Sequence, residues 1–122
     1  MANVITNMGK ALVASRLKGT GAEPKYLAFG TGAGTAGAAD TGLFSEVADG
    51  RVTGTSSLGT TAVANDTYIV TGTYTAPGAR ALTNAGLFTD VSAGELFMKG
   101  DFAVINLAQD DSLTLTMKVQ FV

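Results

Sequence analysis

The residues that could take part in catalysis are few, and their types exclude most kinds of active site. The sequence has no histidine and no cysteine, so it lacks the commonest general base, any thiolate nucleophile and the usual ligands of zinc. Nucleophilic catalysis would need a serine activated by a lysine, or a pair of carboxylates. Ser56 and Ser57 lie in a Ser/Thr/Gly-rich segment without the pattern of a nucleophile elbow.

The aspartates are spaced as turn-forming residues and not as a metal site. Asp110 and Asp111 are adjacent, whereas Asp40 and Asp49 belong to other parts of the chain. A calcium loop uses a spacing such as Asp-x-Asp-x-Asp-Gly, which the sequence does not contain. We therefore predict that the chain is not an enzyme and that it has no metal site and no cofactor.

One glycine-rich stretch has the spacing of a dinucleotide-binding turn. Gly32, Gly34 and Gly37 satisfy GxGxxG after the predicted strand 25–29. That fingerprint also requires a following helix, a second parallel strand and an acidic residue about 20 positions further on. The sequence that follows offers none of these, so we interpret residues 30–37 as a surface loop.

Basic residues gather near the N-terminal end. Residues 1–25 carry a net charge of +3, the remainder carries −5, and the whole chain carries −2. The chain as a whole therefore has no electrostatic preference for nucleic acid. Lys10, Arg16 and Lys18 lie mostly off the apolar positions of a predicted helix and form a weak candidate docking face for an acidic partner. The alternative is a helix that packs on the core and leaves these cations in solvent.

The elements that would position these residues are one helix and a set of strands. Residues 4–18 have apolar residues at helical spacing, with Thr6 or Asn7 as N-cap and Gly19 as the C-terminal glycine. Residues 25–122 are rich in Gly, Thr and Ser, which favours short strands and tight turns. At 122 residues, the chain is predicted to form a single domain, 1–122.

The strand patterns predict the fold class. Residues 81–98 read as a hairpin with a turn at 90–94, and residues 112–121 alternate strictly between polar and apolar. The apolar run 102–107 predicts an interior strand, and 51–63 predicts a weak edge strand. We therefore expect a mainly β protein, an antiparallel β-sandwich with immunoglobulin-like or jelly-roll-like connections and one N-terminal α-helix.

A short motif occurs twice at an offset of 44 residues. Gly42-Leu43-Phe44 matches Gly86-Leu87-Phe88, and the match in character extends over 42–52 and 86–96. A two-fold internal repeat would build the 25–122 sandwich from two similar strand–loop–hairpin halves. Chance similarity in a chain rich in Gly, Thr and Ala is the alternative.

Neither a membrane span nor a secretory leader is predicted. No apolar run approaches the roughly 18 residues of a membrane-spanning helix. The N-terminal residues lack the apolar region of a signal peptide. We therefore expect the protein to be made in, and soluble in, a cytoplasm.

The order of these segments resembles that of small structural proteins of tailed bacteriophages. The segments that carry the resemblance are Val4-Ile5-Thr6-Asn7-Met8-Gly9, Lys25-Tyr26-Leu27-Ala28-Phe29-Gly30-Thr31-Gly32, Ala81-Leu82-Thr83-Asn84-Ala85-Gly86-Leu87-Phe88, Gly94-Glu95-Leu96, Phe102-Ala103-Val104-Ile105-Asn106 and Asp111-Ser112-Leu113-Thr114-Leu115-Thr116. They are similar to phage tail-fibre and tail-collar proteins, whose N-terminal domains attach to the virion. A tail fibre continues into a stalk and a receptor-binding tip, which these residues do not include.

The resemblance implies a non-enzymatic virion component, made in the host cytoplasm, that forms a homo-oligomer such as a trimer. It would occupy the tail, the neck or collar, or the baseplate, in contact with other virion proteins and not with nucleic acid or membrane. A capsid decoration (cement) protein is an alternative. A further alternative is a small carbohydrate- or ligand-binding β-sandwich, for which three tyrosines and no tryptophan provide a poor aromatic platform.

Overall fold

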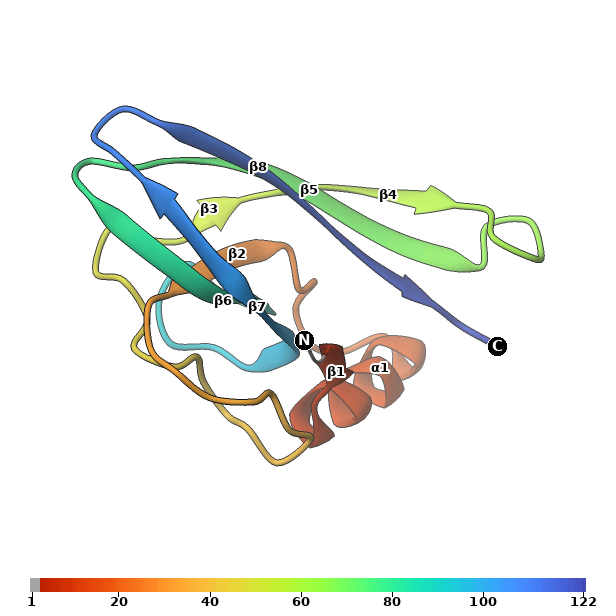
Figure 1. Ribbon diagram of the computed structural model, residues 1–122. Helices are drawn as coiled ribbons and strands as arrows, with labels where there is room; N and C mark the ends of the chain where they lie inside the picture. The colour runs from red at the N-terminus through yellow and green to blue at the C-terminus, as the bar shows by residue number, and fades with distance from the viewer. Residues whose placement is uncertain (1–2) are drawn as a thin grey trace.

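Residues 3–122, which the computed structural model describes, form two antiparallel sheets and one helix (Figure 1). The larger sheet has the strand order β1-β7-β6-β2-β3, and the smaller sheet has the order β4-β5-β8. The elements are β1 Asn3–Ile5, α1 Asn7–Lys18, β2 Tyr26–Gly30, β3 Val52–Thr53, β4 Thr55–Gly59, β5 Thr67–Thr75, β6 Arg80–Phe88, β7 Leu96–Leu107 and β8 Ser112–Gln120. The protein is thus mainly β, an antiparallel sandwich with an N-terminal helix, as predicted.

Two strand pairs pass from one sheet to the other and hold the sheets together. β5 continues into β6 through residues 76–79, and β7 continues into β8 through residues 108–111. Figure 1 shows both connections at the same end of the molecule. There Ala76 N–H donates to the Asp111 carbonyl and Asp110 N–H donates to the Ala76 carbonyl, both at 2.8 Å. The two connections are therefore hydrogen-bonded to each other where the chain passes from one sheet to the other.

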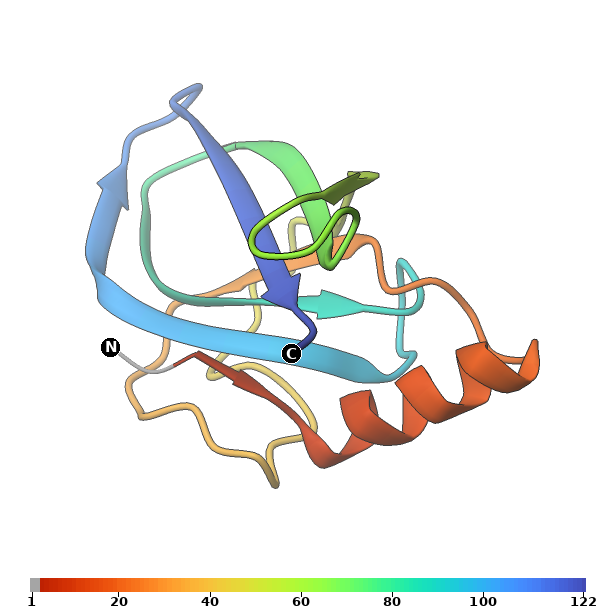
Figure 2. The ribbon, with the colours of Figure 1, turned by 90° about the vertical axis from the view of Figure 1, so that its right-hand side faces the viewer.

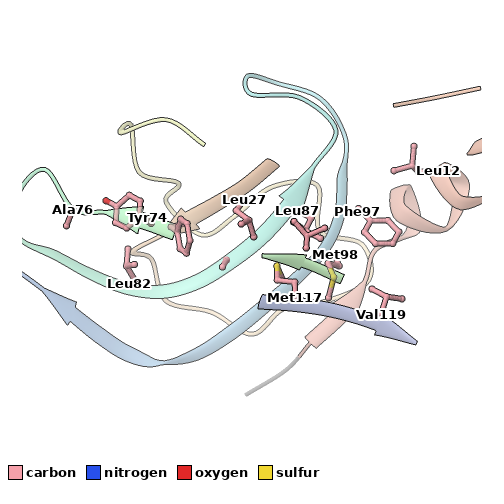
Figure 3. Packing of buried hydrophobic residues seen from close by; sticks show 13 residues of the cluster. Leu12, Leu27, Tyr74, Ala76, Leu82, Leu87, Phe97, Met98, Met117 and Val119 are labelled. Atoms are coloured by element: carbon pink, nitrogen blue, oxygen red, sulfur yellow. The ribbon is translucent and has the colours of Figure 1, made fainter. Parts of the chain in front are cut away.

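The core lies between the two sheets. Leu27 and Leu87 of the larger sheet and Val70 of the smaller sheet are fully buried. The rings of Phe29 and Tyr74 pack with their centroids 4.9 Å apart. Figure 3 shows side chains from α1 and from strands of both sheets meeting in this layer. Burial of each large apolar side chain favours folding by about 1.5–3 kcal/mol.

The helix is shorter than predicted, because α1 begins at Asn7 and not at residue 4. Val4 and Ile5 instead belong to β1, which pairs with β7 at the edge of the larger sheet. The apolar spacing of two residues fits a helix or a strand equally well. Hydrogen bonding to β7 stabilises Val4 and Ile5 in the strand conformation.

Both predicted helix caps are present, but the buried face of α1 differs from the predicted apolar stripe. Thr6 Oγ1 accepts a hydrogen bond from Gly9 N–H at 3.0 Å, and Gly19 is left-handed with φ of 93°. The residues of α1 that are buried are Gly9 and Leu12. A Cβ added at Gly9 would overlap the Phe97 carbonyl oxygen of β7. A close approach of backbones therefore sets how α1 lies along β7 (Figure 2).

The predicted hairpin is present, whereas the similar segment 42–52 does not form a second hairpin. β6 and β7 pair antiparallel across the turn 89–95, where Ala93 and Gly94 have φ of 55° and 74°. The matching segment 42–52 is a loop up to β3, apart from a bridge between Glu46 and Gly30. The shared motif thus folds in two ways. Residues 86–88 belong to β6 and pair with β2 and β7, whereas residues 42–44 form a loop whose backbone is bonded by side chains of β6 and β7.

The apolar run 102–107 is the second half of β7 and is not an interior strand, so this prediction is wrong. Within the described residues, β1 pairs with β7 only as far as Gly100, and β6 is the one partner beyond it. Val104 is consequently 53% exposed. By contrast, β3 and β4 within 51–63 are edge strands of the two sheets, as predicted.

Candidate interaction surfaces

One group of charged side chains fixes the loop 31–51 to the sandwich. Arg80 donates two hydrogen bonds to the Asp49 carboxylate, at 2.7 and 2.8 Å, and the buried Tyr74 hydroxyl donates to the same carboxylate at 2.5 Å. The bond from Arg80 lowers the pKa of Asp49, and burial raises the pKa of Tyr74 to about 12. The group is a structural link between β5, β6 and the loop.

A second link is built on a buried lysine. Lys99 is 1% exposed, and its Nζ donates to Asp40 Oδ2 at 3.0 Å and to the Gly42 carbonyl at 2.9 Å. The ammonium also lies 3.2 Å from the centroid of the Phe44 ring. A backbone hydrogen bond from Gly37, and then the bond from Lys99, lower the pKa of Asp40. The loop is therefore fastened to β7 as well.

The aspartates considered as metal ligands are engaged separately. Asp40 pairs with Lys99 and Asp49 pairs with Arg80. Asp110 is exposed in the β7–β8 turn with φ of 70°. Among residues 3–122, no group of three or more potential ligand residues is arranged to hold a metal ion.

The glycine-rich loop packs against a ring. A Cβ added at Gly32 or Gly34 would come within 3 Å of Phe44. Gly32 N–H donates to the Phe44 carbonyl at 2.8 Å, and its own carbonyl accepts from the Thr83 hydroxyl. These glycines permit close packing of the loop onto the larger sheet, where the GxGxxG spacing alone suggested a phosphate-binding turn.

A groove of about 390 Å³ lies between α1 and the smaller sheet, and we call it the α1 groove. It is formed where α1, the segment 23–24, β4, β5 and the chain after β8 meet. Its apolar walls include Leu12, Val13, Leu17, Leu58, Tyr68 and Phe121. These residues come from segments far apart in the sequence, so no local pattern indicated the groove.

Three apolar side chains of the α1 groove are exposed to solvent. Leu17 is 86% exposed, Leu58 is 64% exposed and Phe121 is 49% exposed. A single exposed leucine is ordinary on a protein surface. A group of exposed apolar side chains along one groove is typical of a binding surface. The α1 groove is therefore the first candidate interaction surface.

The α1 groove also has a polar end. The Tyr68 hydroxyl donates to Glu23 Oε2 and to the Pro24 carbonyl, both at 3.0 Å. Burial raises the pKa of Tyr68, and a hydrogen bond with Ser56 lowers the pKa of Glu23. Arg16 lines the groove as well. The groove thus combines apolar walls with a guanidinium and a carboxylate.

The three cations of the candidate docking face are all exposed on α1, but they do not share one face. At about 100° per residue, Lys10 and Lys18 lie about 80° apart around the helix axis. Arg16 lies about 120° from Lys10 in the opposite direction. Only Arg16 lines the α1 groove among these three. The same angles could have been read from the sequence.

The outer face of the smaller sheet carries paired hydroxyl groups. The cross-strand pairs are Thr71–Thr116, Thr73–Thr114 and Thr75–Ser112, with oxygen–oxygen distances of 3.1, 2.9 and 3.1 Å. Alternation along 112–121 predicted the polar face of β8. The pairing of the hydroxyl groups depends on the register between the strands, which alternation does not give. This hydroxyl face is the second candidate surface, together with the edge of β8.

Two further findings concern the chain as a whole. No helix among residues 3–122 has the length and apolar character needed to cross a membrane. Searches against protein-family models, curated proteins and solved structures found no match to the chain. The α1 groove, the hydroxyl face with the edge of β8, and the resemblance of the sequence segments are therefore the features that bear on function.

Proposed function

We propose that the chain is a non-enzymatic structural component of a tailed-phage virion that assembles as a homo-oligomer on the tail, the neck or collar, or the baseplate. The observation that carries the proposal is the α1 groove, where Leu17, Leu58 and Phe121 are exposed together. Covering such apolar surface with a neighbouring subunit favours association by about 25 cal/mol per Å² buried. The resemblance of the helix and hairpin segments to phage attachment domains supports the location.

The ion pairs support a structural role. Arg51 donates to Glu46 at 2.9 Å and lies over the Phe88 ring at 3.6 Å, so it joins the loop 31–51 to β6. Together with the Lys99–Asp40 and Arg80–Asp49 pairs, it fixes this long loop at separate points. A subunit that repeats in a symmetric particle needs a surface of one fixed shape, which such links favour.

One observation favours a second candidate, a small ligand-binding β-sandwich. The volume of the α1 groove, about 390 Å³, falls in the range of small-molecule sites. Its Tyr68 hydroxyl already bonds to Glu23 and Pro24, which leaves fewer polar groups for a ligand. We therefore place the virion component first.

Gold-labelled antibodies against the purified chain, imaged on phage particles by electron microscopy, test the proposal. We expect label at symmetric positions on the tail, neck or baseplate. Label over the capsid would instead identify a decoration protein. Particles that carry no label, and that lack the chain in mass spectra of their proteins, would contradict a virion role.

A pair of matched variants tests the part played by the α1 groove. Leu17→Ser together with Leu58→Ser removes exposed apolar surface from the groove and should reduce incorporation into particles. Val104→Ser is the control, because Val104 is similarly exposed on β7 and does not line the groove. Circular dichroism shows whether each variant keeps its fold.

A further inference from the structure

The open edge of β8 is a feature that the fold does not use. β8 has nine residues, and in the described part of the chain it pairs on one side only, with β5. Its register with β5 runs without a shift from Thr67↔Gln120 to Thr75↔Ser112. Proteins usually protect such edges with short strands, bulges, prolines or charges. Within β8 the one protective feature is the charge of Lys118.

Hydrogen bonds just beyond the two ends of β8 show which of its residues face the open edge. Ala76 N–H donates to the Asp111 carbonyl, and Phe121 N–H donates to the Asp66 carbonyl. Antiparallel ladders alternate bonded and non-bonded positions, so odd-numbered residues of β8 bond to β5. The residues whose N–H and C=O groups point away from β5 are therefore Ser112, Thr114, Thr116, Lys118 and Gln120.

We propose that this edge pairs with β8 of a second copy of the chain, antiparallel about a two-fold axis at Thr114. The inference rests on the proposed homo-oligomer and gives it a second contact surface beside the α1 groove. In this register Thr114 pairs with Thr114 of the second copy, and Ser112 pairs with Thr116 on either side of the axis. The outward N–H and C=O groups of these residues are then satisfied, and the two smaller sheets become one continuous sheet.

The side chains on both faces of β8 match in this register. On the outer face, the Thr73–Thr114 hydroxyl pair continues across the axis to the same pair of the second copy. On the inner face, Leu113 meets Leu115 of the second copy, and both leucines are half-buried in the single chain. Pairing therefore covers apolar surface that the monomer leaves partly in water.

Charge selects this register over its neighbour. With the axis at Thr114, Lys118 lies two positions beyond the last strand pair, Thr116 with Ser112, and so beside the β7–β8 turn of the second copy, where the Asp110 carboxylate is exposed. In the adjacent register, with the axis at Leu115, Lys118 would lie opposite Ser112 of the second copy, and with the axis at Thr116 it would lie opposite Thr114; neither residue carries a countercharge. Opposite charges across a strand pair stabilise it. Lys118, which discourages indiscriminate edge pairing, is thereby complementary to a second copy.

Disulfide cross-linking tests the pairing directly, because the chain has no cysteine of its own. Thr114→Cys places two thiols at the axis, where the Cα–Cα distance of about 5.5 Å suits a disulfide. Thr73→Cys is the matched control: it lies beside Thr114 on the same exposed face, but its copies would be about 14 Å apart. We expect Thr114→Cys to form covalent dimer at least about tenfold faster.

Three outcomes distinguish this inference from the proposed function. Equal cross-linking of the two variants, or faster cross-linking of Thr116→Cys, would overturn the pairing at Thr114. Oligomeric wild-type chain without Thr114→Cys cross-linking would place the contact elsewhere, overturning the inference and leaving the homo-oligomer in place. Wild-type chain that is monomeric at every concentration would overturn both.

Two substitutions test the contact without cysteine. Thr116→Pro removes an outward N–H and none of the bonds to β5, so the fold should persist while the dimer is lost. Lys118→Glu faces Asp110 with a like charge and should raise the dimer Kd by about tenfold, which adding Asp110→Asn should partly reverse. A folded Thr116→Pro variant that dimerises as well as wild type would overturn the pairing.

Discussion

Lys99 Nζ lies 3.0 Å from Asp40 Oδ2, so a cation in the body of β7 holds a carboxylate of the loop 31–51. Replacing Lys99 by Met removes this bond and the bond to the Gly42 carbonyl. Because the Asp40 side chain keeps 27% exposure, we expect the free energy of unfolding to fall by about 2–3 kcal/mol, less than for a fully buried pair. Urea unfolding measures this change in the free energy of unfolding. Lys10→Met, which is exposed on α1 outside the α1 groove, should change the free energy of unfolding by no more than about 0.5 kcal/mol. An equally small effect for Lys99→Met would contradict the link.

Acid should destabilise the protein in part through the two aspartates that fasten the loop 31–51. The pKa values of Asp40 and Asp49 are lower in the folded chain than the 3.8 of an unperturbed aspartate. Their stabilising contribution is therefore complete above about pH 4 and is lost as the pH falls through the lower folded-state values. The urea midpoint should decrease below pH 4, and Asp40→Asn with Asp49→Asn should flatten that decrease. An unaltered slope in the double variant would show that other groups control acid unfolding.

Tyr74 should make stability sensitive to alkali. Tyr74→Phe removes the bond to Asp49 and should cost about 1–2 kcal/mol, as measured by thermal or urea unfolding. Because burial raises the pKa of Tyr74 to about 12, its contribution is complete below about pH 10 and is lost as the pH rises toward 12. Tyr26→Phe is the control, since the Tyr26 hydroxyl has no hydrogen-bond partner among residues 3–122. Equal losses in the two variants would argue against a specific role for Tyr74.

Gly9 should not tolerate alanine, although alanine is the better helix former by about 1 kcal/mol. The added Cβ would overlap the Phe97 carbonyl, so α1 would have to move away from β7. We expect Gly9→Ala to lower the unfolding free energy by about 2–3 kcal/mol or more in urea. Gly42→Ala meets no atom within 4 Å and should be nearly neutral. A stabilised Gly9→Ala variant would mean that the helix does not approach β7 so closely.

The parts of the fold that local patterns predicted are those that local physics controls. Strict alternation over 112–121 and the small residues at 90–94 specify a strand and a turn without reference to distant residues. The path of the loop 31–51 depends instead on Lys99 and Arg80, which lie far along the chain. Its motif at 42–52 therefore looked like a hairpin and folded as a loop.

The candidate surfaces were less predictable than the strands. Counting apolar side chains along 4–18 overlooked Gly9, whose missing side chain is what brings α1 onto β7. The α1 groove joins Leu17 to Leu58 and Phe121, and only the folded chain brings these three together. The edge of β8 follows from strand order, which depends on the sheets as a whole.

Light scattering on the purified wild-type chain, from about 1 μM to about 1 mM, tests most directly whether this protein is a self-assembling subunit. The chain has a mass of 12.3 kDa. We predict a measured mass that rises with concentration to twice that value or a higher multiple. A mass of 12.3 kDa over the whole range would contradict self-assembly.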